Sequence, residues 1–288
     1  MTDKTHPTKS PLLEFLDCEA LDLNLYRGQS RDLKTGQVYG GQVLGQAIKA
    51  AYNTIDDNRH IHSAHAYFLT RGDVGAPIIY EVDRSLDGGS FSSRRVVAIQ
   101  HGRQIFHLSA SFQKPEEGLD FYRKWVPPID ALHDAVEKMI PERHNFQSEY
   151  FDVHYLPKDR LTRDDCVQYW MKAKHALPDN KACHNSVLAY ISDMGLLLAT
   201  LVPHGLEQAT EPRKQAQQVL LATIDHAIWF HRPFRADDWL FYECRVQSTG
   251  NGRGYATGRI YDQQGCLVAS TTQEGLLRLK RDKAKRKS

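Results

Sequence analysis

The sequence contains few cysteines, and their spacing argues against two common kinds of small protein. There are five among 288 residues, an odd number, and no two of them form a Cys-x-x-Cys pair. Disulfide frameworks and zinc knuckles need paired or closely spaced cysteines. We therefore expect reduced cysteines, most of them in the core, at Cys18, Cys166, Cys183, Cys244 and Cys266.

Long apolar runs are also missing. No uninterrupted apolar stretch approaches the roughly 20 residues of a membrane-spanning helix. Residues 1–6 lack the charged and then apolar pattern of a secretory signal. These two features predict an intracellular protein with no membrane span.

An excess of charge of one sign is absent as well. The chain has 37 basic and 35 acidic residues, a formal net charge of +2. Six basic residues and one acid lie in 280–288, so this segment carries +5 and leaves −3 for the rest. A body without a broad positive field does not favour nucleic acid as a partner. We interpret 280–288 as a solvated basic tail.

The sequence does contain an internal repeat. His65-Ala66-Tyr67-Phe68 and His226-Ala227-Ile228-Trp229 each open a run of strand-like segments. The runs close on the similar tripeptides SFQ at 111–113 and TTQ at 271–273, so the openings lie 161 residues apart and the closings 160. A duplication of this length predicts two similar lobes. The chain is also about twice as long as a typical domain of roughly 100 to 150 residues.

Each half is predicted to hold one long helix followed by an antiparallel meander. Apolar residues recur three and four apart over 41–55, which predicts a helix there. A second helix is predicted over 185–201, a segment that is overwhelmingly apolar in its centre. Alternating apolar and polar residues predict strands at 78–83, 106–112 and 240–246, and 167–172 is a further strand candidate. We expect an α+β fold in which a curved antiparallel sheet wraps around a helix, twice.

The predicted domain organisation follows from this order. The segment between the halves is rich in proline and charge and is interpreted as a linker with an entering strand at 151–155. We expect an N-terminal tail, a first lobe, the linker, a second lobe and the basic C-terminal tail, at 1–10, 11–115, 116–150, 151–279 and 280–288.

Six short motifs lie in a fixed order over about residues 12 to 278. They are YRGQS at 26–30, VYGGQVLGQA at 38–47, HSAHAYF at 62–68, TIDH at 223–226, WFHRPF at 229–234 and ASTTQEG at 269–275. Together they resemble the type II acyl-CoA thioesterases, tandem (double) hot-dog enzymes of bacteria and of eukaryotic peroxisomes. The resemblance implies that the protein hydrolyses acyl-CoA thioesters to free fatty acid and CoA.

The resemblance also implies three catalytic residues. By motif, Asp193 would be the general base, while the hydroxyl of Thr223 and the amide of Gln273 would orient the attacking water. The segment 187–198 around Asp193 is almost wholly apolar. A buried carboxylate there needs hydrogen-bond partners, because an unpaired buried charge costs several kcal/mol, as an order-of-magnitude estimate.

The chemistry of a thioester makes so small a site sufficient. The departing thiolate has a pKa near that of free cysteine, about 8.5, so it scarcely needs an acid. We expect no cofactor, since CoA is part of the substrate. Backbone N–H groups at a helix start commonly stabilise the oxyanion in hot-dog enzymes, and Gly40-Gly41-Gln42 is the candidate here.

Other polar motifs favour structural roles. His60 and His62 share a strand face but lack an evident third ligand, so we expect no metal site. His226 has a histidine counterpart in the first repeat whereas Asp225 does not, which favours a structural histidine over an acid–base pair. Gly88–Ser92 does not match the Gly-x-Ser-x-Gly nucleophile elbow.

The CoA phosphates would need local basic residues. Most of the candidates are expected to be surface or structural charges, namely Arg27, Arg71, Arg94, Arg95, Arg232 and Arg253.

Two alternative functions stay open from the sequence. A hot-dog hydratase normally has a histidine five residues after its aspartate, but Leu198 stands there. A non-catalytic acyl-CoA-binding or regulatory protein would not need the three polar residues.

Location and assembly follow from the same resemblance. Lys285-Arg286-Lys287-Ser288 is not a Ser-Lys-Leu-type peroxisomal signal, so we expect a cytoplasmic protein. We also expect a homo-oligomer, a dimer or tetramer, because hot-dog sheets often pair across an edge.

Overall fold

A computed structural model describes residues 10–33, 35–130, 132, 149–156, 158–206 and 219–280. Nearly all of the predicted N-terminal tail and of the basic C-terminal tail lies outside these residues. Part of the predicted linker does so as well.

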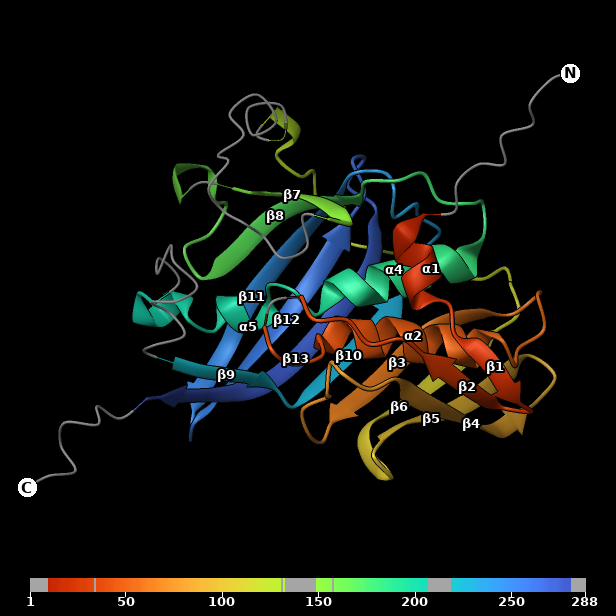
Figure 1. The fold of residues 1–288 in the computed structure, drawn as a ribbon. Helices are drawn as coiled ribbons and strands as arrows, with labels where there is room; N and C mark the ends of the chain where they lie inside the picture. The colour runs from red at the N-terminus through yellow and green to blue at the C-terminus, as the bar shows by residue number, and fades with distance from the viewer. Residues whose placement is uncertain are drawn as a thin grey trace, which may run out of the picture.

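Within its described residues, the first half contains two helices of the core and six strands, whose arrangement Figure 1 shows. Their bounds are α1 (Pro11–Leu16), β1 (Glu19–Asp22), β2 (Leu25–Gly28), α2 (Gly40–Tyr52), β3 (His60–Phe68), β4 (Ile78–Asp87), β5 (Phe91–Gln100) and β6 (Arg103–Gln113). The predicted helix over 41–55 is therefore confirmed as α2, and the strands at 78–83 and 106–112 as parts of β4 and β6.

The second half repeats the pattern with a long helix and a meander. Its elements are β7 (Phe151–Tyr155), η1 (Lys158–Arg160), β8 (Cys166–Ala173), α4 (Lys181–Ser192), α5 (Leu196–Ala199), η2 (Val202–His204), β9 (Val219–Thr223), β10 (Asp225–Phe230), β11 (Leu240–Gly250), β12 (Arg253–Tyr261) and β13 (Leu267–Leu279). The predicted strands at 151–155, 167–172 and 240–246 are confirmed.

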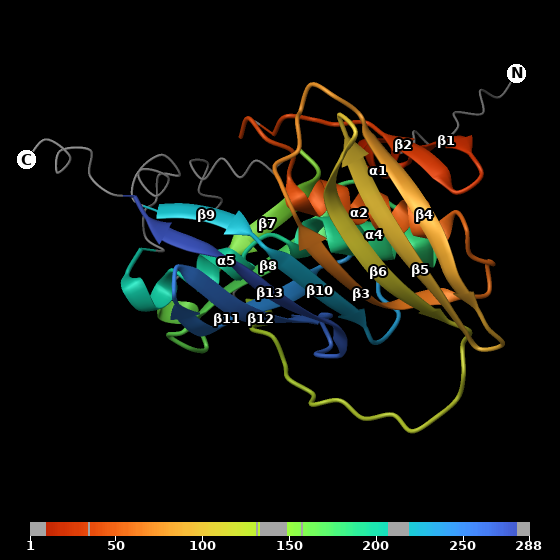
Figure 2. The same cartoon turned by 90° about the horizontal axis from the view of Figure 1, so that it is seen from below.

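The strands of both halves form one antiparallel sheet. Its order is β1-β2-β4-β5-β6-β3-β10-β13-β12-β11-β8-β7, and β9 pairs with β13 beside β10. Strands β3 and β10 join the two halves. The sheet curves around α2 and α4, which lie side by side in the core (Figure 2). The predicted α+β architecture, in which a curved antiparallel sheet wraps around a helix in each half, is confirmed.

The pairing of β3 with β10 shows that the alignment of the two sequence repeats has to be shifted by one residue. His65 lies opposite Ala227, and Ala66 lies opposite His226. Residues opposite each other share a face of the sheet and neighbours alternate, so the two histidines lie on opposite faces. His65 is exposed, whereas His226 is buried. The predicted equivalence of the two histidines is therefore wrong by one residue, although the duplication of the lobes holds.

The second long helix also differs from its prediction. Instead of one helix over 185–201, α4 ends at Ser192 and α5 begins at Leu196. Gly195 between them has a φ of +95°, a conformation that costs glycine little and other residues much. The break places Asp193 at the end of α4, and this decides the geometry of the site.

The stretch Lys181–His204 is, by length and composition, apolar enough to cross a membrane. However, 72% of its apolar 18-residue window is buried inside the protein, as in a core helix, so it is weak evidence for a span. All five cysteines are free, and Cys166, Cys183 and Cys244 are buried as expected.

Candidate active site

The three predicted catalytic side chains meet at one point. Thr223 Oγ1 donates to Asp193 Oδ1 at 3.3 Å, and Gln273 Nε2 donates to the same oxygen at 3.0 Å and to Thr223 Oγ1 at 2.8 Å. Asp193 follows α4, Thr223 is the last residue of β9, and Gln273 lies in the middle of β13. Pairing of Gly275 with Thr223 brings the two strands into this register.

Burial and hydrogen bonding act on Asp193 in opposite directions. Burial raises its pKa above the usual value, because the charged form loses its water. The nearby His226, the two side-chain hydrogen bonds and the backbone N–H of Gly41 all lower it, and burial is the largest effect. A carboxylate with a raised pKa and several donors is suited to accept a proton.

The start of α2 lies against this carboxylate. A Cβ on Gly40 would lie 2.6 Å from Asp193 Oδ2, and a Cβ on Gly41 would lie 2.0 Å from the carbonyl oxygen of Tyr190. Only glycine permits this approach of the two helices. The positive end of the α2 dipole therefore faces Asp193. The predicted oxyanion donors at Gly40-Gly41-Gln42 are thus close to the site, although the N–H of Gly41 already acts on the carboxylate.

Two tyrosines from the sheet hold the end of α4. Tyr242 donates from its hydroxyl to the carbonyl of Ser192 at 2.9 Å, and Tyr169 donates to the carbonyl of Met194 at 2.6 Å. Both rings are fully buried. A Cβ on Gly195 would lie 2.8 Å from the Tyr169 hydroxyl, so the glycine makes room for this contact. Carbonyls that a continuous helix would bond internally are instead bonded by the sheet.

His226 contacts the site through side chains. Its Nδ1 lies 3.0 Å from Gln273 Oε1, and its Nε2 lies 3.0 Å from Ser192 Oγ. Asp225 points elsewhere and accepts a hydrogen bond from the N–H of Glu274 at 2.7 Å. The expectation that Asp225 and His226 do not form an acid–base pair agrees with this geometry.

Several of the remaining sequence candidates have other partners. His62 Nε2 lies 2.8 Å from Ser111 Oγ. Within the described residues, no group of three His, Cys, Asp or Glu side chains could hold a metal ion. Four of the six candidate arginines pair with carboxylates, which fits structural or surface roles: Arg27 with Glu19, Arg94 with Asp87, Arg232 with Asp120 and Arg253 with Glu274.

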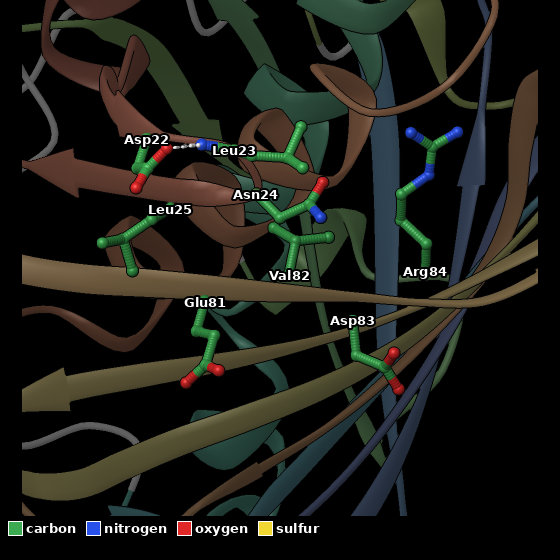
Figure 3. A pocket seen from close by; sticks show the side chains of 8 residues that line it. All are labelled: Asp22, Leu23, Asn24, Leu25, Glu81, Val82, Asp83 and Arg84. Atoms are coloured by element: carbon green, nitrogen blue, oxygen red, sulfur yellow. Dashed lines mark hydrogen bonds between the residues drawn. The ribbon is translucent and has the colours of Figure 1, made fainter.

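A hollow on the outer surface is a weaker candidate. It lies between the turn joining β1 to β2 and strand β4 (Figure 3). Its lining includes three carboxylates and one guanidinium, and none of the three predicted catalytic residues: Asp22, Leu23, Asn24, Leu25, Glu81, Val82, Asp83 and Arg84. An acidic lining would repel the phosphates of CoA. We therefore place the candidate active site at Asp193.

Comparison with known proteins identifies the class to which this fold and site belong. Residues 30–113 match the family described as "Acyl-CoA thioesterase N-terminal domain", and residues 116–277 match "Acyl-CoA thioesterase C-terminal domain". The chain belongs to the acyl-CoA thioesterase family. The predicted family is confirmed, and so is the tandem arrangement of two related lobes.

Individual relatives are similar in sequence to this chain over nearly its whole length. The chain is 38% identical to "Acyl-CoA thioesterase 2" of Haemophilus influenzae, covering 93% of this chain and 96% of that protein. It is 34% identical to human "Acyl-coenzyme A thioesterase 8", covering 92% and 88%. The crystal structure of the acyl-CoA thioesterase II TesB2 from Mycobacterium marinum has a TM-score of 0.78 and 38% identity, covering 93% and 98%.

A more distant structure supports the fold alone. A protein with a hot-dog fold from Alicyclobacillus acidocaldarius has a TM-score of 0.72 and 18% identity, covering 93% of this chain and 97% of that one. The double hot-dog prediction is confirmed.

Proposed function

We propose that the protein hydrolyses acyl-CoA thioesters to a free fatty acid and CoA, using a water activated by Asp193. One observation carries the proposal: a carboxylate, a hydroxyl and an amide from three elements are hydrogen-bonded together, with the amide fully buried and the other two groups half-buried. The acyl-CoA thioesterases named above are related over nearly the full chain and support the same activity.

The hydrogen bonds suggest how the proton moves. Asp193 Oδ1 already accepts from Thr223 and Gln273. The other oxygen, Oδ2, lies beside the start of α2, where the N–H of Gly41 also acts on the carboxylate, and we assign Oδ2 the proton of the attacking water. The water oxygen then bonds to the thioester carbonyl carbon, and the negative charge moves to the carbonyl oxygen. The positive end of α2 stabilises this charge.

Collapse of the tetrahedral intermediate completes the reaction. The carbonyl re-forms, the C–S bond breaks, and the electron pair leaves with sulfur as the CoA thiolate. The proton held by Asp193 returns to solvent or to the thiolate, which regenerates the base. One water is consumed, and one acid and one thiol are formed.

The decisive experiment removes only the base. Asp193→Asn keeps the size of the side chain, and we expect thiol release from an acyl-CoA to fall at least roughly a hundredfold, the scale of a lost general base. The rate of thiol release should fall by the same factor in Asp193→Ala. Glu274 pairs with Arg253 beside the site, so Glu274→Gln is the matched control and should keep wild-type activity. Wild-type rates in Asp193→Asn would remove Asp193 from the mechanism.

The two alternative functions are less well supported. The curated relatives over this length are thioesterases. The three-residue cluster, which a passive acyl-CoA-binding protein does not need, is intact.

We further propose a cofactor-independent, cytoplasmic homo-oligomer that acts in fatty acid metabolism. The thiolate leaving group makes a metal unnecessary for the reaction. Five free cysteines suit a reducing compartment. Light scattering of the purified protein would give the number of subunits.

A further inference from the structure

We propose that His226 is a positioning residue that sets the direction in which the Gln273 amide points. The inference rests on the proposed hydrolysis by Asp193 and extends it to a residue behind the reacting groups. His226 is 1% exposed and touches Gln273 on the side away from Asp193 and Thr223.

The argument begins with the two ends of the Gln273 amide. Its nitrogen has two hydrogens, and both are used, toward Asp193 Oδ1 at 3.0 Å and toward Thr223 Oγ1 at 2.8 Å. Its oxygen lies 3.0 Å from His226 Nδ1. The opposite orientation would place the amide oxygen against the Asp193 carboxylate, and two acceptors in contact repel each other. Only the observed orientation lets the cluster hold the base.

The imidazole of His226 selects this orientation when its Nδ1 carries a hydrogen. Nδ1–H can donate to the amide oxygen but cannot accept from the amide nitrogen. On the other side of the ring, Nε2 lies 3.0 Å from Ser192 Oγ. The Nδ1–H tautomer of the neutral ring requires the Ser192 hydroxyl to donate to Nε2, which Ser192 can do by giving up its bond to the Ala189 carbonyl.

A second state of Ser192 preserves the same direction. Ser192 Oγ also lies 2.9 Å from the carbonyl of Ala189. If His226 were protonated, Nε2–H would donate to Ser192 Oγ and the serine hydroxyl would donate to Ala189. The Nδ1–H bond to Gln273 is present in both states. Burial lowers the pKa of His226, which favours the neutral form.

Replacing His226 by Asn or by Gln distinguishes a role in orienting Gln273 from a role in core packing. Asn at position 226 puts its side-chain nitrogen near the place of Nδ1 and can still donate to Gln273. Gln is longer and puts its polar end near the place of Nε2, where it reaches Ser192 instead. We expect His226→Asn to keep kcat within about fivefold of wild type. We expect His226→Gln to lose about tenfold or more, the scale of one lost hydrogen bond in a buried network.

A double-mutant cycle shows whether His226 acts through Gln273. In the Gln273→Ala background the amide is gone, so His226→Gln should cause little further loss of kcat. KM should change little in either His226 variant, because the residue does not touch the substrate. Additive losses, or equal losses in the Asn and Gln variants, would overturn the proposal.

Control variants complete the design. His65 lies on the opposite face of the same junction and is exposed, so His65→Asn and His65→Gln should both keep wild-type kcat. Melting curves identify any variant that does not fold. If His226→Gln is one, His226→Leu replaces it, because Leu fills a similar volume but cannot donate to Gln273, and this variant should lose about tenfold or more in kcat. Wild-type kcat in folded His226→Leu would overturn the proposal.

Failure of this inference is distinguishable from failure of the proposed function. If Asp193→Asn is inactive while His226→Gln is as active as wild type, only the positioning role is wrong. If Asp193→Asn is fully active, the proposed mechanism itself is wrong.

Discussion

Asp193 has to be ionised to act as a base, yet it lies where ionisation is unfavourable. Burial raises its pKa above 3.8, so folding favours the protonated form. This contribution to stability is present below the unfolded-state pKa and is lost as pH rises through the higher folded-state pKa. At neutral pH the protein therefore keeps a carboxylate that functions at the expense of stability, as active sites often do.

The first prediction at the residue scale concerns pH. Activity should rise with pH as Asp193 loses its proton, and the midpoint of this limb of kcat/KM should lie above 3.8 because the pKa is raised. Steady-state thiol release measured across acidic pH tests this. If the residual activity of Asp193→Asn rises with pH at the same midpoint, the titrating group is not Asp193.

At the scale of elements, the contact between the start of α2 and the end of α4 controls the site. The two helices approach so closely that Gly41 has no room for a side chain. On the other side, the hydroxyls of Tyr169 and Tyr242 bond the carbonyls at the end of α4. The aspartate is held between a helix start and a sheet.

A second prediction tests this helix contact. Gly41→Ala places a methyl group 2.0 Å from the Tyr190 carbonyl, so the helices must separate. We expect a loss of about 1–3 kcal/mol in the free energy of unfolding, typical of an overpacked core. We also expect lower kcat, because the helix start moves away from Asp193. Denaturant unfolding with parallel thiol-release assays measures both.

The matched control for this helix contact is Gly118→Ala, at a glycine with no atom within contact distance. It should leave stability and activity close to wild type. Equal effects of the two substitutions would show that the α2–α4 approach is not limiting.

At the scale of the whole molecule, the two lobes build one site together. Asp193, Thr223 and Gln273 come from the second lobe, while Gly40 and Gly41 come from the first. Pairing of β3 with β10 makes the sheet continuous across the junction. Neither lobe presents the complete site on its own.

The third prediction follows from this shared construction. Fragments 1–115 and 116–288 expressed separately should each lack thioesterase activity, since each loses one side of the site and exposes a junction strand. Co-expression should restore activity as β3 and β10 pair. Thiol-release assays on the two fragments and on the reconstituted pair measure this. Full activity in fragment 116–288 alone would contradict a shared site.

The duplication, the two long apolar segments and most strands can be predicted from the order of the residues alone, because side-chain periodicity shows which face of an element is buried. Its motifs also singled out Asp193, Thr223 and Gln273. The break at Gly195 was missed, since one glycine within an apolar run is compatible with a continuous helix. The buried tyrosines behind it look like ordinary strand residues in the sequence.

How these residues meet depends on the packing of the folded chain. The repeat placed His65 and His226 in equivalent positions, but a shift of one residue in a strand reverses the face, and only the pairing of β3 with β10 fixes that register. The contacts of His226 with Gln273 and Ser192 join residues 47 and 34 positions apart. Such contacts depend on how the chain packs, which local pattern does not record.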